Sequence, residues 1–206
     1  MWDYTQRELR MAARNGDLAQ LRAVLASCRP DLGPVGVDVD AGSSEGWTAL
    51  HQAALKGHVV CLEALLAAGA SVHSLTNCGS TPLYCASRNG HAACVRALIA
   101  AGSDVHRANQ THGSTPFTGA LNFGHRGVLK TLLRAGANVH TGNANRNKTN
   151  ADAWLFVDAI QIVGGWPQYV HLRRKTLIDK MARWNNLPDA INLEIAAFLE
   201  PPGGDS

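Results

Sequence analysis

The chain has 206 residues, enough for one elongated domain, and carries 19 Lys and Arg against 16 Asp and Glu. The formal net charge of +3 is too small to require a nucleic-acid partner, and we expect none. Residues 1–14 carry charges in place of an apolar core, and no run of about 18 apolar residues follows, so we expect neither a secretory signal nor a membrane span.

The five cysteines are an odd number, which does not fit a set of paired disulfides. Because no secretory signal is recognised, we expect reduced thiols and a cytoplasmic or nuclear location. Cys61 and Cys94 occupy equivalent places in two similar segments, on the apolar side of an expected helix, and we predict that both are buried.

Residues 5–42 begin with a helical pattern that contains Ala12, Ala13 and Gly16. The pattern starts with polar residues, which suit the outer face of a terminal unit in a stack. Gly16 precedes the next equivalent glycine, Gly57, by 41 residues, and the extra length falls in a segment rich in Pro and Gly. We predict a surface loop there, with a contact to a partner as the alternative.

A longer pattern follows and recurs twice. The segment TALHQAALKGHVVCLEALLAAG at 48–69 returns as TPLYCASRNGHAACVRALIAAG at 81–102 and as TPFTGALNFGHRGVLKTLLRAG at 115–136. Gly57, Gly90 and Gly124 are 33 and 34 residues apart, and such a period indicates a stacked repeat. Each Thr is a helix N-cap and each Gly ends a helix, so every unit is a helix pair that must cover its apolar face with a neighbour.

These residues resemble the ankyrin repeat, whose T-P-L-H-x-A-A-x-x-G-H core and L-L-x-x-G-A motif they reproduce. The resemblance implies an all-α solenoid of stacked helix-turn-helix units with short β-hairpin-like loops. Its three repeats occupy 43–140, with units of about 43–75, 76–109 and 110–142, and 5–42 is a degenerate N-terminal capping repeat with a loop insertion. Some positions depart from the family pattern: His51 keeps the family's histidine, whereas Tyr84 and Thr118 replace it, and Gly119 lies inside the expected first helix of the third repeat.

The pattern changes after residue 140. An Asn-rich loop precedes an apolar helix at 151–163, an amphipathic basic helix at 167–184 and a last short helix that ends at Leu199. We expect 151–200 to be a C-terminal helical cap, with its basic residues solvated, and 201–206 to be a disordered tail. Alternatively, 169–199 resembles the box of ankyrin-repeat ubiquitin-ligase adaptors, which recruits an elongin–cullin complex.

The sequence contains no strong signal for metal binding, catalysis or cofactor binding. No C-x-x-C or H-x-x-x-H pair is present, so we expect no metal, and His58, His91 and His125 belong to the repeat motif. Cys85 and His51 could form a nucleophile pair, but nothing in the sequence supplies a third, orienting group. A nucleophile elbow, a P-loop and a dinucleotide fingerprint are also absent from the sequence, so we predict no catalytic or cofactor-binding residues.

The resemblance instead implies a concave binding face, built from hairpin tips and the ends of the first helices. We predict a non-catalytic protein-binding or scaffold module, monomeric, with a protein partner that the sequence does not identify. A ubiquitin-ligase substrate adaptor is the first alternative and an enzyme the second. The resemblance also implies a modification by asparaginyl hydroxylase, with His106 in the target place after Leu98 and Asp104. The predicted protein-binding residues are Arg14, Asn15, Glu45, Trp47, Leu55, Lys56, Asn77, Cys78, Ser80, Arg88, Asn89, Thr111, His112, Ser114, Asn122 and Phe123.

Overall fold

The computed structural model describes residues 2–26, 38–139, 151–162, 167 and 170–171. Within these residues the secondary structure is helical and no strand is present, which confirms the all-α prediction. The chain divides into two compact units, Met1–Trp154 and Leu155–Ser206. The helices are α1 (Trp2–Asn15), α2 (Leu18–Ala26), α3 (Ala49–Lys56), α4 (Val59–Ala67), α5 (Pro82–Arg88), α6 (Ala92–Ala100), α7 (Pro116–Asn122), α8 (Arg126–Arg134) and α9 (Ala151–Ile162).

The first helix of each full repeat begins where the sequence predicts it. Thr48, Thr81 and Thr115 have extended backbones, and each hydroxyl accepts a hydrogen bond from the backbone N–H three residues later. This bond satisfies one of the free donors at the helix start. Pro82 and Pro116 follow at the first helical position, where a missing N–H costs nothing.

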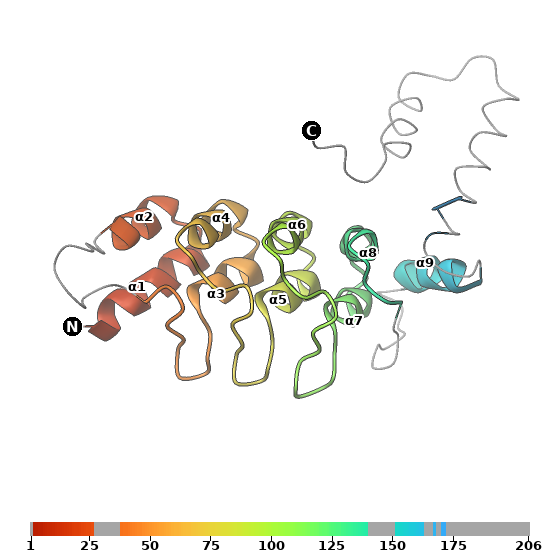
Figure 1. Ribbon diagram of the computed structural model, residues 1–206, viewed down its shortest axis with the longest axis horizontal. Coiled ribbons are helices and arrows are strands. Elements are labelled where there is room, and N and C mark those ends of the chain that lie inside the picture. Colours follow the sequence, from red (N-terminus) through yellow and green to blue (C-terminus); the bar gives the residue numbers. More distant parts are fainter. Residues whose placement is uncertain (1, 27–37, 140–150, 163–166, 168–169, 172–206) are drawn as a thin grey trace, which may run out of the picture. The chain divides into compact units, whose positions relative to one another are not determined.

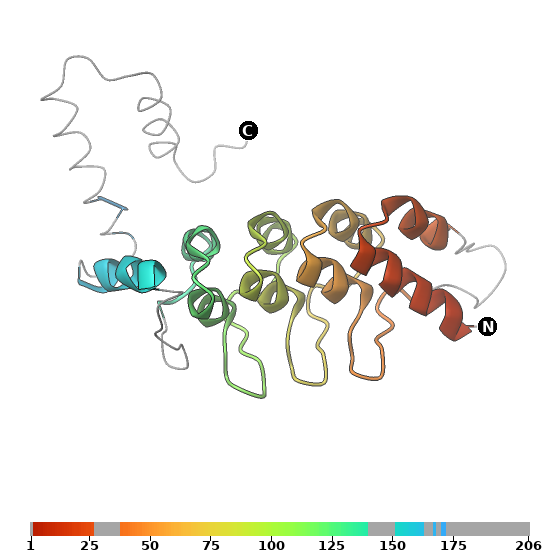
Figure 2. The same cartoon turned by 180° about the vertical axis from the view of Figure 1, so that it is seen from behind.

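The helices of the first unit form two rows (Figures 1 and 2). One row is α1, α3, α5 and α7, and the other is α2, α4, α6 and α8; each helix contacts the next member of its own row and its partner in the same repeat. The space between the rows is filled by aliphatic side chains that are fully buried, including Leu50, Leu62, Leu83, Leu98 and Leu129. Their burial supplies the main cohesive force of the stack.

Successive repeats are also joined by a recurring histidine contact. His58, His91 and His125 each precede a second helix, and each ring donates a hydrogen bond from Nε2 to a carbonyl near the end of the preceding repeat's first helix. The acceptors are the carbonyl oxygens of Arg14, Leu55 and Arg88, at 3.1, 3.0 and 3.0 Å respectively. These rings therefore fix the register between neighbouring repeats, as expected for motif residues.

Helix α1 begins at Trp2, ahead of the predicted start of the first repeat at residue 5. It packs on α2 and α3, and Arg10 in its middle reaches the end of the predicted loop. Arg10 donates from Nη1 to the carbonyl oxygens of Ala41 at 3.2 Å and Gly42 at 3.4 Å. The end of this connection is thus held by α1, whereas its residues 27–37 lie outside the described part of the chain.

Helix α9 agrees with the helix predicted at 151–163, and it buries Trp154, Phe156, Val157 and Ile160. The expected cap at 151–200 stays a prediction, because most of that segment lies outside the described residues. The same holds for the basic residues near Arg173, the box-like segment 169–199 and the tail 201–206. Within the described ranges, no helix combines the length and the apolar character that crossing a bilayer requires.

Candidate functional site

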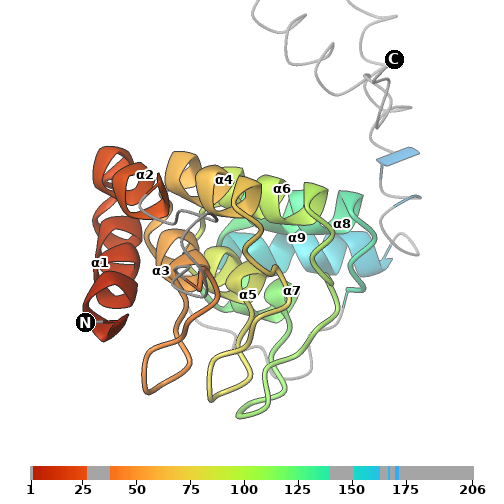
Figure 3. The same ribbon diagram turned by 60° about the vertical axis from the view of Figure 1, so that its left-hand side comes forward.

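Three hairpin loops precede the first helices of the full repeats and project side by side from the same row (Figure 3). Each is closed by a backbone hydrogen bond: Ser43 N to Trp47 O, Thr76 N to Ser80 O, and Asn109 N to Ser114 O. The third loop closes over one residue more than the other two. This extra residue in the tip explains why Gly90 and Gly124 are 34 residues apart while the preceding interval is 33.

The hairpin tips are also bonded to one another. Asn77 N donates to Glu45 O at 3.0 Å, and Gln110 N donates to Cys78 O at 3.1 Å. The Thr111 hydroxyl adds a second bond to the same Cys78 carbonyl, at 3.3 Å. Backbone polar groups that would otherwise be left to solvent are thereby paired, and the three tips form one continuous, fixed edge.

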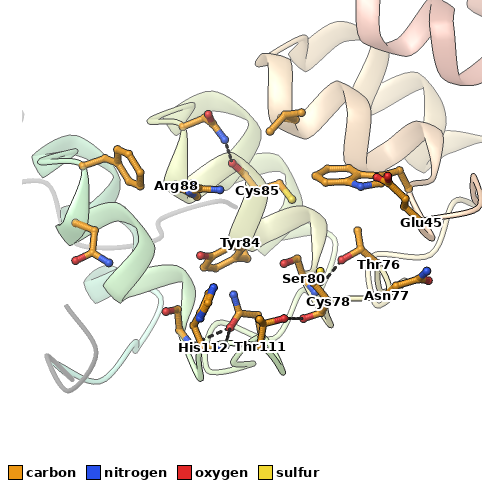
Figure 4. Close-up of a pocket in the computed structure, with 17 residues that line it drawn as sticks. Glu45, Thr76, Asn77, Cys78, Ser80, Tyr84, Cys85, Arg88, Thr111 and His112 are labelled. Atoms are coloured by element: carbon orange, nitrogen blue, oxygen red, sulfur yellow. Dashed lines mark hydrogen bonds between the residues drawn. The ribbon is translucent and has the colours of Figure 1, made fainter. Parts of the chain in front are cut away.

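This edge and the ends of the first helices enclose a groove with a volume of about 1010 Å³ (Figure 4). Side chains from three consecutive repeats line it. The lining residues are Glu45, Trp47, Leu55, Thr76, Asn77, Cys78, Ser80, Tyr84, Cys85, Arg88, Asn89, Asn109, Thr111, His112, Ser114, Asn122 and Phe123.

The predicted site residues fall on this groove with three exceptions: Arg14, Asn15 and Lys56 are exposed but do not line it. Arg14 and Asn15 belong to the first, degenerate repeat, whereas the groove is lined by the three repeats that follow it. Whether the lining residues bind a partner stays a prediction. The structure adds Thr76, Tyr84, Cys85 and Asn109 to the groove. Of these four, Tyr84 was detectable in the sequence, because it replaces the family's histidine.

Tyr84 lies in the middle of the groove, between Arg88 and the tip residues Thr111 and His112 (Figure 4). Its ring has room because the next repeat has a glycine there: a Cβ on Gly119 would lie 3.1 Å from Tyr84 Cε2. Burial raises the pKa of the half-buried Tyr84 hydroxyl, and the nearby Arg88 charge opposes this shift. The hydroxyl is therefore neutral at physiological pH, and it is hydrogen-bonded to the side chains of Ser114 and Asn109 in the third hairpin.

Arg88 and Phe123 contact each other at the end of the groove. The Arg88 guanidinium carbon lies 5.1 Å from the centroid of the Phe123 ring, within the range of a cation–π contact. Phe123 in turn stacks on His125, with ring centroids 6.4 Å apart and planes 15° from parallel. Phe123 is nevertheless 51% exposed, so one large aromatic surface remains open to a ligand.

Trp47 packs against its own repeat and also lines the groove. Its ring lies edge-on against His51, with centroids 5.8 Å apart. His51 itself is fully buried. Its Nε2 donates to the Ser80 carbonyl at 2.9 Å, so Nδ1 is the acceptor in its 2.9 Å bond with the Thr48 hydroxyl.

The proposed nucleophile pair of Cys85 and His51 is not arranged for catalysis. Both ring nitrogens of His51 are already bonded to other groups, and burial lowers its pKa from 6.5 to about 4. Burial also raises the pKa of the Cys85 thiol to about 12, against a smaller opposite effect of Arg88. The base is therefore weak and the thiol stays protonated at neutral pH, contrary to what an activated cysteine needs.

The other histidines and cysteines in the described part of the chain pack in the repeats or lie at the surface. Cys61 and Cys94 are 2% and 0% exposed, which confirms their predicted burial. In the ranges that the structure describes, no three His, Cys, Asp or Glu side chains are grouped in a way that could hold a metal ion. Asp104 and His106 are exposed and Leu98 is buried; the hydroxylation of His106 stays a prediction.

Comparisons with known proteins agree with this geometry. The sequence profile of the family described as "Ankyrin repeats (3 copies)" matches residues 9–109 and 61–143. A similar solved structure is the crystal structure of the human ASB11 ankyrin repeat domain, with 35% sequence identity and a TM-score of 0.56. The match covers 64% of this chain and 55% of that one. No curated protein matches the sequence. Since the family profile covers well over half of its length, the chain belongs to the ankyrin-repeat family.

Proposed function

We propose that this protein is a non-catalytic binding module that holds a protein partner along the groove. Ankyrin repeats generally mediate protein–protein interactions. The observation that carries the proposal for this chain is the groove itself, in which hairpin tips and helix ends of three repeats meet. Its elements are tied together by hydrogen bonds between the tips, so a partner would meet a preorganised surface and lose less entropy on binding.

The residue types in the groove also support a protein partner. Trp47, Tyr84, Arg88 and Phe123 belong to the classes that dominate binding energy at protein interfaces. Trp47 and Tyr84 are half-buried, and Phe123 is half-exposed, so each ring is positioned by neighbours yet still has area to lose to a partner. A partner that crosses this row would remove water from aromatic rings that are already held in place.

Affinity purification with the intact chain would identify the partner, and titration of variants would then locate the binding surface. We expect Trp47→Ala and Phe123→Ala each to weaken binding roughly thirtyfold, the result of losing about 2 kcal/mol at a central interface aromatic. The matched controls Glu63→Ala and Arg96→Ala change exposed residues of α4 and α6 outside the groove and should have little effect. Loss of binding in the controls alone would show that the groove is not the recognition surface.

The same purification separates this proposal from the adaptor alternative. An adaptor would carry elongin and cullin components with it, and deletion of residues 169–206 would release them while the groove-bound partner stayed attached. A module that only binds its partner would yield the groove-dependent protein without ligase components.

A further inference from the structure

The groove has an uneven charge distribution. Among its lining residues Arg88 carries a permanent positive charge, and Glu45 on the first hairpin tip carries the negative one. Arg88 is exposed, at the C-terminal end of α5, and in the described part of the chain its guanidinium contacts an aromatic ring and makes no ion pair. Its charge is therefore not neutralised by a carboxylate within the groove.

The contact with Phe123 leaves Arg88 able to bind an anion. The guanidinium carbon lies over the Phe123 ring, and the N–H groups of a guanidinium match the two oxygens of a carboxylate. A side chain already held by a ring also loses less rotamer entropy when it forms that pair. The first helices of the two preceding repeats also end in a basic residue. Arg14 lies two residues before Gly16 and Lys56 one residue before Gly57, and these positions are close to that of Arg88 before Gly90.

The neighbouring amides suit a peptide backbone. Asn89 donates one N–H to the Cys85 carbonyl at 2.8 Å, and Asn77 donates one to the Ser44 carbonyl at 3.0 Å. These bonds fix the two side chains, whose amide oxygens can then accept from the N–H groups of a bound chain. The two amides belong to the same repeat, one at its hairpin tip and one at the end of α5, and one extended segment could meet both.

We propose that the groove binds an extended peptide segment of the partner and that an Asp or Glu side chain of this segment pairs with Arg88. The inference rests on the proposed function and names the chemistry of the bound segment. A carboxylate fits better than a phosphate, because a phosphate carries a charge of about −2 and Arg88 is the only guanidinium among the lining residues, with Glu45 opposing it.

The test uses the full chain and a displayed library of random twelve-residue peptides as the probe. We expect the selected peptides to be enriched in Asp and Glu. Each is then synthesised as a pair in which the acid is kept or replaced by its amide, Asn or Gln. The acidic member should bind the wild-type protein about tenfold more tightly or better, as expected for a hydrogen-bonded charged group.

Variants assign this preference to Arg88. Arg88→Gln should remove the difference between the acid and amide peptides, and Arg88→Lys should retain part of it because the charge remains without the planar fork. Arg96→Gln makes the same change of charge on α6, outside the groove, and should leave the preference intact. Far-ultraviolet circular dichroism during heating checks that each variant is folded.

Two results would overturn the inference. The first is a set of selected peptides that shows no enrichment in Asp and Glu, or whose preference for the acid survives Arg88→Gln. If Trp47→Ala and Phe123→Ala still weaken the binding of these peptides, the groove remains the binding surface and only the pairing of Arg88 with an acidic side chain is wrong. The second is a library that yields no binding peptide, which excludes an extended acidic segment. Peptides that bind equally well to all groove variants would instead count against the proposed function.

Discussion

The contact of the His91 ring with the preceding repeat predicts that alanine substitutions at two glycines of one repeat will reduce stability by different amounts. Gly57 ends α3 with φ +80°, and Gly69 follows α4 with φ +87°, so alanine is strained to a similar degree at both positions. The surroundings differ. A Cβ at Gly57 would lie 2.7 Å from His91 Cε1, whereas a Cβ at Gly69 meets no heavy atom within 4 Å.

The two substitutions should therefore differ in cost. Gly69→Ala carries the left-handed strain alone, about 1 kcal/mol after the gain from a less flexible unfolded chain. Gly57→Ala adds the displacement of the His91 ring, which now donates to the Leu55 carbonyl at 3.0 Å. Losing this bond and the packing of the ring costs about 2 kcal/mol more. For a protein of this size the extra cost corresponds to a melting temperature lower by about 4–8 °C.

Urea and thermal unfolding followed by circular dichroism would measure both variants. A second comparison uses His91→Ala: once the ring is absent, Gly57→Ala should cost no more than Gly69→Ala, so the double variant should be more stable than the sum of the single changes by about 2 kcal/mol. Equal melting temperatures for Gly57→Ala and Gly69→Ala, or full additivity in the double variant, would refute the role given to the histidine contact.

Two further predictions follow from burial. A polar alkylating reagent should modify the exposed Cys78 quickly and the buried Cys61 and Cys94 slowly. Mass spectrometry would measure the rate of modification at each cysteine, and fast reaction of the buried thiols in the folded protein would contradict their burial. His51, whose pKa falls from 6.5 to about 4 on folding, stays neutral while the unfolded chain takes up a proton. Its contribution to stability is complete above pH 6.5 and declines by about 3 kcal/mol as the pH falls to about 4. His51→Gln should remove this part of the pH dependence in urea titrations, and an unchanged slope would disprove it.

The sequence by itself determined the local elements of this fold. In the three full repeats, a Thr before the first helix and a Gly after each helix act through hydrogen bonds and backbone angles within a few residues, so their positions predict the helix boundaries. The period near 33 then determined which residues stand at equivalent places. Most of the predicted row lines the groove because stacking repeats one geometry from unit to unit.

Only the tertiary structure determined the features of the groove that arise from contacts between two neighbouring repeats. Tyr84 belongs to the groove because Gly119, a residue of the next repeat, leaves space for its ring. The Arg88 guanidinium contacts the ring of Phe123, again from the next repeat, and Arg14 and Asn15 lie outside the groove, which the three following repeats line. Such outcomes arise from contacts between side chains far apart in the sequence, and a pattern read along one repeat carries no information about how its neighbour fills the shared space.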